Sequence, residues 1–514
     1  MKKTQLLLPF FVFGFLFTSC SKDDDVTEEP AVDPVEEIEE EPEEEEEDTR
    51  NLEVEEFIYA GMNEIYLYKA DVPTLADNTF STELEWRDFL DEFDSPLDLY
   101  EGLQSSVDNF SFMTDNYVAL ENNFAGKATT NGMQLGLYLF GNNEILAIVN
   151  YVLPNTPAEE KGIKRGVAFT EVNGKRMTLN NYQGLLAAQS YAITIAEIKG
   201  STIYATEETV TLNQIEYNTN PVFITKTMDV DGRKVGYLMY NSFTANYDEA
   251  LNNAFAELQT AGITDLVLDL RYNGGGSVAS AVGLAGMITG QYKDQVFLKQ
   301  QWNEKYQNAW PAESYINRFK DNITLDRQLE SERDVLLNSL GLSKVYVLTT
   351  DRTASASELI INGLDPYIDV VQIGTTTTGK FQASVTLYDS PNFGREGANE
   401  NHTYAIQPLV YKSTNKDGVS DYVEGIDPDI EVEEDPGNMG VLGDKNEPLL
   451  KAALNDIAGI PQDQEEIAMA KRATFNFKLV GESGMNEPSY QRMYIQELPD
   501  FLKQHLKEKR TKEK

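Results

Sequence analysis

One stretch of nine residues, ITDLVLDLR at positions 263–271, constrains the fold of this chain more than any other. It is almost continuously apolar, which is typical of a strand that helices cover on both faces of a parallel sheet. Two further apolar runs, at 344–350 and 367–374, flank the amphipathic stretch ASELIINGL at 356–364. This strand–helix–strand succession predicts an α/β core over residues 222–435, in which functional side chains gather in the turns at the carboxyl ends of the strands.

Outside this region the hydrophobic pattern changes along the chain. Residues 51–125 repeat apolar positions at helical spacing, residues 126–214 alternate apolar and polar positions as strands do, and residues 436–514 are expected to be mainly helical. The predicted segments are a signal peptide (1–19), an acidic disordered tether (20–50), a helical N-terminal domain (51–125), a β domain (126–214), the α/β core (222–435) and a C-terminal, mainly helical segment (436–514).

The formal net charge of −43 is distributed unevenly. Residues 23–50 hold 17 acidic side chains and one Arg. Like charges repel and such a segment has little to bury, so it is expected to be an extended tether. Residues 51–514 still carry −30, and a surface of that sign repels nucleic acid.

The first residues have the pattern of an export signal. A basic MKK start and the apolar stretch LLLPFFVFGFLF precede FTSC, which ends at Cys20. The apolar stretch is too short to span a bilayer. FTSC resembles the lipobox of bacterial lipoproteins, which implies acylation of Cys20 and anchoring to the outer membrane; CSKDDD resembles a signal for the outer cell surface. A plain secretory signal is the alternative. With one cysteine, no internal disulfide can form.

Three consecutive glycines follow the central apolar run, in DLRYNGGGS at positions 269–277. Glycines at the end of a buried strand let backbone N–H groups face outward without obstruction by a Cβ atom. Such a turn can hold an anion, either a phosphate or a reaction oxyanion. It is not a P-loop, because no Gly-Lys-Ser/Thr sequence follows. A tight strand–helix turn without a ligand is the other interpretation.

The second strand-end turn is TASASEL, which contains Ser355 and Glu358. Ser-x-x-Glu ahead of an apolar helical pattern is a capping box, so Ser355 can simply cap a helix. It can also be a nucleophile if a base lies nearby. Lys380 ends GTTTTGK, the turn after the next strand, and neighbouring strand ends meet at one edge of a sheet. A lysine withdrawn from water has a lowered pKa and can accept a proton. His402 is an alternative base.

TASASEL, the spacing from Ser355 to Lys380 and the upstream DLRYNGGG together resemble the C-terminal processing peptidases, or tail-specific proteases. The resemblance covers about residues 55–455. It implies a multidomain α+β protein with a ClpP/crotonase-like α/β protease core, a preceding PDZ domain and a helical N-terminal domain. It also implies Ser355 as nucleophile and Lys380 as general base. The oxyanion hole would be formed by the backbone N–H of Ala356 and of a glycine in the turn, Gly275 or Gly276.

The chain departs from the family pattern in two places. Many members have a Gln four residues after the lysine, where it orients the amine, but this chain has Ser384 there. Gln382 is the nearest substitute, although it alternates to the other face of a strand that begins at Lys380. The common oxyanion turn is Asn-Pro-Gly-Gly, and here Gly274 replaces its Pro.

The stretch TPAEEKGIKRGVAFTEVNGK at 156–175 resembles a PDZ domain of the circularly permuted kind found in bacterial proteases. PDZ domains bind an extended tail by adding it to an exposed strand edge. The resemblance places this edge at Leu135, Gly136 and Leu137 in GMQLGLYLF. A small sandwich with no ligand is the alternative.

The expected activity is therefore that of a lipid-anchored serine endopeptidase of the bacterial cell envelope. Its partners would be protein or peptide substrates bound by their tails and, through Cys20, a membrane. We expect no cofactor, and no metal site because the chain has neither a His-x-x-x-His motif nor a Cys pair. The alternatives are a non-catalytic peptide- or ligand-binding protein on the same fold, and a scaffold that uses only its PDZ groove.

Overall fold

The apolar run at 263–271 forms β12 (Asp265–Asp269), a central strand of a six-stranded sheet in a computed structural model of the chain. The structure describes residues 50–199, 202–327, 331–461 and 477–512. The predicted signal peptide, Cys20 and the acidic tether before Arg50 lie outside the described residues. Residues 51–514 form one unit by their contacts, and the description below concerns that unit.

The sheet has the order β10-β11-β12-β18-β19-β24. Neighbouring strands from β11 to β24 run parallel, and only β10 pairs antiparallel, with β11. The other five strands are β10 (Val222–Val230), β11 (Arg233–Tyr240), β18 (Lys344–Thr349), β19 (Asp369–Gly374) and β24 (Ile430–Glu431). The α/β character predicted for this region is therefore present.

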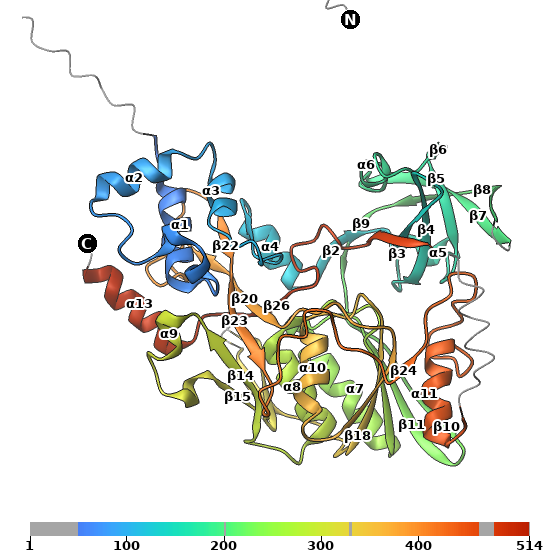
Figure 1. Ribbon diagram of the computed structural model, residues 1–514. Helices are drawn as coiled ribbons and strands as arrows, with labels where there is room; N and C mark the ends of the chain where they lie inside the picture. The colour runs from blue at the N-terminus through green and yellow to red at the C-terminus, as the bar shows by residue number, and fades with distance from the viewer. Residues whose placement is uncertain (1–49, 200–201, 328–330, 462–476, 513–514) are drawn as a thin grey trace, which may run out of the picture. The chain divides into compact units, whose positions relative to one another are not determined.

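Helices cover both faces of this sheet (Figure 1). Alternate side chains of β12 enter two different cores, because successive residues of a strand point to opposite faces. Leu266 and Leu268 pack with three helices on one face, and Val267 packs with one helix on the other. The three helices are α7 (Asp248–Ala261), α8 (Val278–Thr289) and α10 (Ala356–Leu364), and the one is α11 (Pro448–Ala458).

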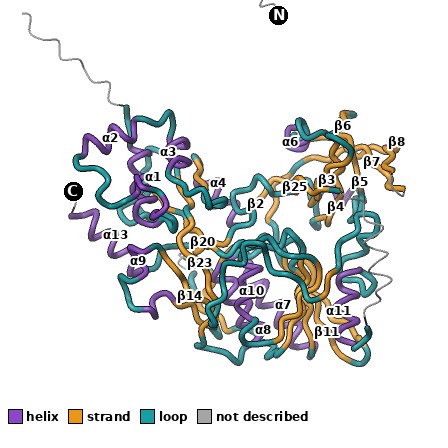
Figure 2. The backbone as a smooth tube through the Cα atoms, viewed as in Figure 1, coloured by secondary structure: helices purple, strands orange, loops and turns teal. Residues whose placement is uncertain are grey.

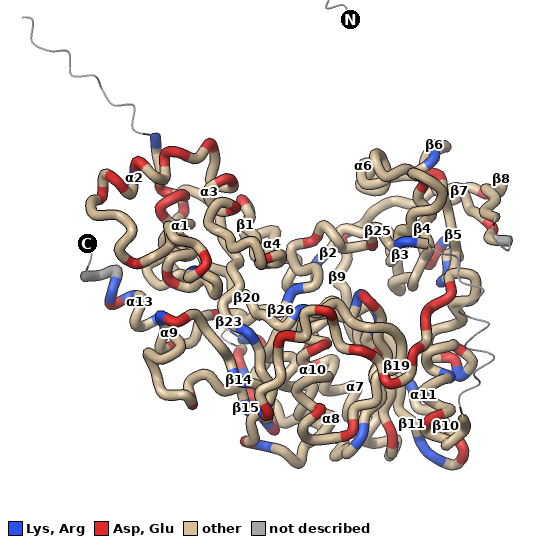
Figure 3. The backbone as a smooth tube through the Cα atoms, in the orientation of Figure 1, with Lys and Arg blue, Asp and Glu red and all other residues tan. Residues whose placement is uncertain are grey.

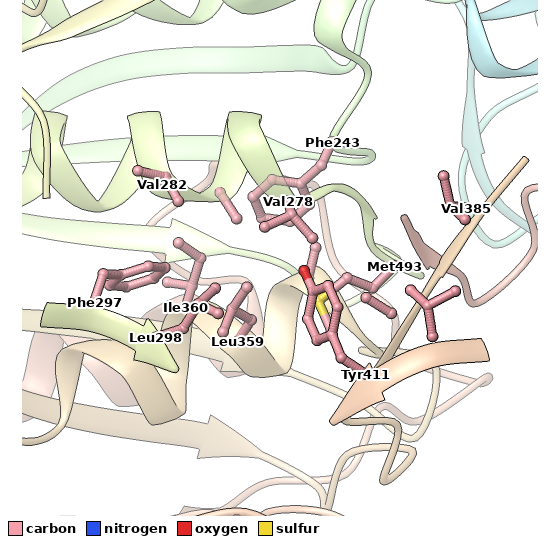
Figure 4. Close-up of a cluster of buried hydrophobic side chains, with 14 of the residues drawn as sticks. Phe243, Val278, Val282, Phe297, Leu298, Leu359, Ile360, Val385, Tyr411 and Met493 are labelled. Atoms are coloured by element: carbon pink, nitrogen blue, oxygen red, sulfur yellow. The ribbon is translucent and has the colours of Figure 1, made fainter. Parts of the chain in front are cut away.

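A second six-stranded sheet, of order β13-β26-β20-β23-β14-β15, packs beside α8 and α10. Figure 4 shows Met493 from β26 among Tyr411, Leu359 and other buried apolar side chains of this core. The strands of this sheet are β13 (Gly276–Ser277), β26 (Met493–Ile495), β20 (Gln382–Val385), β23 (Leu409–Thr414), β14 (Val296–Trp302) and β15 (Ile316–Arg318).

Residues 127–218 form a small β domain. Its outer pair is β2 (Lys127–Thr130) with β9 (Ile215–Asn218), and its sheet has the order β25-β3-β4-β5-β7-β8. The strands of that sheet are β3 (Met133–Phe140), β4 (Glu144–Val152), β5 (Ala168–Val172), β7 (Ser190–Lys199), β8 (Thr202–Asn213) and β25 (Lys478–Glu482). Figure 2 shows that β25, although it lies near the C-terminus of the sequence, runs beside β3.

The prediction of a mainly helical segment over residues 436–514 missed β25 and β26. α11 and α13 (Asp500–Lys512) are helices, but two strands lie between them. Both strands are too short for an alternating pattern to show, and each forms by pairing with strands distant in sequence.

The N-terminal part of the unit contains four α-helices and packs on the core. They are α1 (Glu53–Ile65), α2 (Glu83–Asp91), α3 (Pro96–Gly102) and α4 (Tyr117–Phe124). α2 begins after Thr82, which is its N-cap residue and whose Oγ1 accepts the Glu85 N–H at 3.2 Å.

Acidic side chains are spread along most of the described chain, as Figure 3 shows, and outnumber Lys and Arg. Among the described residues there is no helix of the length and apolarity needed to cross a membrane.

Candidate active site

Ser355 stands at the N-terminus of α10 in a strained backbone conformation. Its φ and ψ angles are 65° and −112°, a region that non-glycine residues rarely adopt. The side chain is fully buried, and its Oγ makes no hydrogen bond within the described part of the chain. Ser355 is thus the N-cap residue of α10 with a hydroxyl that is free within the described residues, and of the predicted capping box the bond from its N–H to the Glu358 side chain is present.

Glu358, one turn into α10, joins this serine to Lys380. Its Oε2 accepts the backbone N–H of Ser355 at 2.6 Å and that of Lys380 at 2.9 Å. Its Oε1 accepts the Gly379 N–H and the Thr377 hydroxyl, both at 2.6 Å. One carboxylate therefore supports the strained turn and the lysine turn together. Glu358 was predictable as part of a capping box, whereas its bonds to the lysine turn have no signal in the local sequence.

The Lys380 side chain is fully buried and its Nζ has no hydrogen-bond partner among the described residues. The Nζ lies 4.6 Å from the centre of the Phe110 ring. Burial lowers the pKa of Lys380 well below its usual value, and the nearby charge of Arg492 lowers it further. This environment favours an uncharged amine, which is the form that can accept a proton.

The glycine turn touches the serine directly. A Cβ atom on Gly275 would lie 2.7 Å from Ser355 Cβ and 2.9 Å from the Ala356 nitrogen, and Gly275 has a φ of +106°. Only glycine tolerates both the approach and the angle. The predicted proximity of Ala356 and the glycine turn is present.

The backbone N–H groups of the turn differ in availability. The Gly275 N–H donates to Asn273 Oδ1 at 2.9 Å, so it is already engaged. Gly276 belongs to β13 and pairs with Met493 of β26. The Gly274 N–H makes no hydrogen bond within the described residues. Of the three glycines, Gly274 thus has an N–H that is free within the described residues, the Gly275 N–H is engaged, and the role of Gly276 stays a prediction.

Asn273 holds this turn in place. Its Nδ2 donates to the Tyr240 carbonyl at 2.8 Å, and its own carbonyl accepts the Ala354 N–H at 3.1 Å and the Ser357 hydroxyl at 2.9 Å. The side chain thus ties the glycine turn to β11, and its backbone ties the turn to the residues around Ser355. This role of Asn273 was not predicted, although an Asn directly before a glycine turn is a signal for it.

Neither residue considered for orienting Lys380 reaches its amine. Gln382 donates to the Tyr68 hydroxyl at 3.1 Å, and the Ser384 hydroxyl donates to the Met493 carbonyl at 3.1 Å. That expectation is wrong here, because both side chains follow the β20 strand and point to partners other than Lys380. The Phe110 ring and the backbone bond to Glu358 position the lysine instead.

His402, the alternative base, makes no contact with Ser355. Its Nε2 lies 3.3 Å from Asp389 Oδ2, and its Nδ1 accepts the Tyr404 N–H at 3.2 Å. Both ring nitrogens are therefore engaged elsewhere. This placement leaves Lys380 as the base candidate beside Ser355.

The strand expected to bind peptide tails is β3, and its edge is not open. Leu137 and Gly136 pair antiparallel with Gly481 and Glu482 of β25, and Leu135 accepts the Ser483 N–H at 3.0 Å. The prediction of an exposed edge is wrong because a segment distant in sequence occupies it.

A cleft of about 450 Å³ lies between the small β domain and the glycine turn. It is lined by Met133 and Tyr182 of the small β domain, by Gly274 and Gly275, and by residues 482–491. Ser355 and Lys380 are not among its lining residues and are both 0% exposed.

Two family models match the chain. Residues 234–432, which include the central sheet, Ser355 and Lys380, match the model of peptidase family S41, and residues 53–112 match the peptidase S41 N-terminal domain. The second match covers most of the N-terminal helices.

Named relatives agree with these matches. The chain is 26% identical over 350 residues to a chloroplastic C-terminal processing peptidase of Tetradesmus obliquus, covering 65% of this chain and 67% of that protein. It is 25% identical over 351 residues to a carboxyl-terminal-processing protease of a Picosynechococcus species, covering 66% and 73%. None of these names supports a non-catalytic carrier.

A solved structure is similar over most of the chain. It is a putative S41 protease from Bacteroides fragilis, 28% identical, with a TM-score of 0.59, covering 79% of this chain and 97% of that one. The site geometry, the two family models and these relatives lead to one conclusion. The chain belongs to peptidase family S41, together with the carboxyl-terminal processing proteases, and is a serine-type peptidase.

Proposed function

We propose that the protein is an endopeptidase in which Ser355 is the nucleophile and Lys380 the general base. The observation that carries this proposal is the shared carboxylate oxygen of Glu358, which accepts the backbone N–H of both residues at 2.6 and 2.9 Å. A strained, buried serine and a buried lysine whose amine makes no hydrogen bond within the described residues are costly to fold, and such features concentrate at active sites.

The proposed reaction has two halves, and in the first the substrate peptide bond is cleaved. The uncharged Lys380 amine takes the proton of the Ser355 hydroxyl as Oγ attacks the scissile carbonyl carbon, which forms a tetrahedral oxyanion. The lysine, now an ammonium, returns the proton to the leaving amine as the peptide C–N bond breaks. An acyl-enzyme on Ser355 remains.

Two backbone donors suit the oxyanion. The Ala356 N–H is in the first turn of α10, where the helix dipole favours negative charge. The Gly274 N–H is the unengaged donor of the glycine turn. In the second half of the reaction Lys380 takes a proton from water as the water oxygen attacks the ester carbonyl. The lysine then returns this proton to Ser355 Oγ as the ester bond breaks and the acid leaves.

Substrate capture is assigned to the small β domain, acting as a PDZ domain. The features that support it are the PDZ-like stretch at 156–175 and a strand, β3, that accepts a further strand at its edge. Substrates would be extended or C-terminal tails. Acylated Cys20 would hold the enzyme at the outer membrane, with the acidic tether between lipid and protease.

Cleavage of casein by the purified protein tests the catalytic assignment. Ser355→Ala and Lys380→Ala are each expected to abolish cleavage, while His402→Ala retains it. Full activity of Lys380→Ala would contradict the assignment of the base. Incubation with radiolabelled palmitate, comparing the native chain with Cys20→Ser, tests the lipid anchor separately.

A further inference from the structure

The chain's own segment 478–491 lies where a substrate of the proposed peptidase would have to lie. It pairs with β3 at one end and reaches the glycine turn at the other. Ser355 and Lys380 are both fully buried, and neither lines the cleft beside this segment.

The contacts of β25 with β3 resemble those of a bound ligand. The segment runs antiparallel to β3, so its C-terminal end lies near the start of that strand. Ser483 makes two hydrogen bonds to Leu135, from its N–H to the Leu135 carbonyl at 3.0 Å and to its hydroxyl from the Leu135 N–H at 2.9 Å. Val480 packs on the apolar core of the small β domain, in the cluster that also holds Leu186 of α6 (Tyr182–Leu186). A main-chain ladder and one apolar anchor are what a strand-adding peptide uses.

The rest of the segment covers the glycine turn. A Cβ atom on Gly274 would lie 3.1 Å from the Gln491 backbone nitrogen, and Gln491 Nε2 donates to Thr378 Oγ1 at 3.3 Å. Gln491 therefore bridges the glycine turn and the turn that leads into Lys380. Glu487 fixes the loop from the other side by accepting from Asn123 Nδ2 at 2.6 Å.

The two ends of the segment differ in how firmly they are held. Beyond it, Met493 is fully buried and pairs with both Gly276 and Ala383, so β26 is an integral strand of the core. Among the residues that the structure describes, β25 forms the outermost strand of its sheet and has β3 as its one partner. Displacing β25 exposes one strand edge, whereas displacing β26 would open the core.

We infer that β25 is an internal ligand of the β3 edge, which a substrate strand must replace before cleavage. The claim that β25 controls cleavage rests on the proposed function. The claim that β25 controls peptide binding rests only on its pairing with β3. Because β26 anchors β25 through about ten residues, its effective concentration at β3 is on the order of 1 mM. A free peptide of the same intrinsic affinity therefore competes poorly until β25 is weakened. The substrate class that fits is an extended chain antiparallel to β3, with an aliphatic residue at the position of Val480.

A disulfide lock tests the inference. Lys478 and Leu139 are paired residues, and the distance between paired antiparallel strands suits a disulfide. Leu139→Cys with Lys478→Cys, in a Cys20→Ser full-length chain, gives a lock that opens on reduction. The matched control joins β7 to β8 through Glu197→Cys with Tyr204→Cys, a pair on the far side of the small β domain.

Binding is measured first, in a Ser355→Ala background that cannot cleave. The probe is a fluorescent KLVGES peptide with a free carboxylate, the sequence of residues 478–483. Oxidation of the β3–β25 cysteine pair is expected to abolish binding of the peptide, and reduction is expected to restore it. Oxidation of the control pair in β7 and β8 is expected to leave peptide binding unchanged. Ser483→Pro removes both bonds to Leu135 and is expected to tighten binding about tenfold. Equal binding by the oxidised and reduced lock overturns the inference, whether or not Ser483→Pro folds.

Casein cleavage by the same variants with Ser355 intact gives the second readout. Oxidation of the lock is expected to stop cleavage reversibly, and Ser483→Pro to raise kcat/KM. If the lock controls peptide binding and no variant cleaves casein, the inference that β25 is an internal ligand is supported and the proposed catalytic function is wrong. If the oxidised lock cleaves casein as fast as the reduced one, the inference is wrong and the proposed function stands.

Discussion

The Nζ of Lys380 lies 4.6 Å from the centre of the Phe110 ring, so an N-terminal residue closes the lysine off from water. A ring face attracts a cation, but the effect of burial on Lys380 is larger and favours the neutral amine. Phe110 therefore acts mainly by excluding water from the Lys380 amine.

Replacing Phe110 should change the pH dependence of kcat/KM. The neutral amine is the active form, so activity rises as pH rises through the pKa of Lys380. Phe110→Ala admits water, which raises that pKa towards its usual value and moves the rise in kcat/KM to higher pH. Phe80→Ala, in the aromatic cluster of the N-terminal helices, is the control for a general loss of packing in this part of the protein. An unchanged profile in Phe110→Ala would contradict the role of the ring.

Lys380→Met should stabilise the protein while it abolishes activity. Below the usual lysine pKa of about 10.4 the unfolded chain binds a proton at Lys380, and burial opposes that proton in the folded chain. The free energy of unfolding of the native protein therefore rises with pH up to the usual lysine pKa. The extra unfolding free energy that Met provides is largest at lower pH and vanishes near that pKa. Thermal unfolding from pH 6 to 10 measures it, with about 2–4 °C in Tm expected for each kcal/mol. Lys175→Met, at an exposed lysine, should show no such trend.

Gly275→Ala should abolish activity and lower stability. The new Cβ would meet Ser355 Cβ at 2.7 Å at a φ of +106°, a conformation that costs a non-glycine residue about 1–3 kcal/mol before any clash. Gly184→Ala is the matched control, because nothing lies within 4 Å of its Cβ position and it stands in α6, where Ala is favoured. Equal casein cleavage by the two variants would show that the glycine turn does not need its close approach to Ser355.

Glu358→Gln should disable the site although it preserves shape. The Glu358 carboxylate accepts hydrogen bonds from three backbone N–H groups and one hydroxyl. In Gln the NH₂ group replaces one of the two acceptor oxygens, so it would face donors and the bonds to that oxygen would be lost. We expect a loss of about 2–3 kcal/mol in unfolding free energy and a fall in kcat/KM of about a hundredfold or more. Chemical denaturation and casein kinetics measure the two effects. The substitution Glu304→Gln, at an exposed carboxylate, should change neither.

The parts of this site that local sequence encodes were predictable. Ser355 and Lys380 each follow a strongly apolar strand, and strand order alone brings such turns to one edge. Phe110 and Gln491 have no such signal, because their places depend on packing between segments far apart in the chain. The β25 strand was missed for the same reason: its five residues have no clear alternation, and the edge of β3 determines its conformation.

The pairing of β26 has a consequence for the order of folding. Met493 joins the strand of the glycine turn to the strand that follows Lys380, and it is distant in sequence from both. Pairings between distant segments form slowly, because the chain between them must first be ordered. A folding intermediate that has its local helices and hairpins but lacks β26 is therefore expected to be an inactive protease.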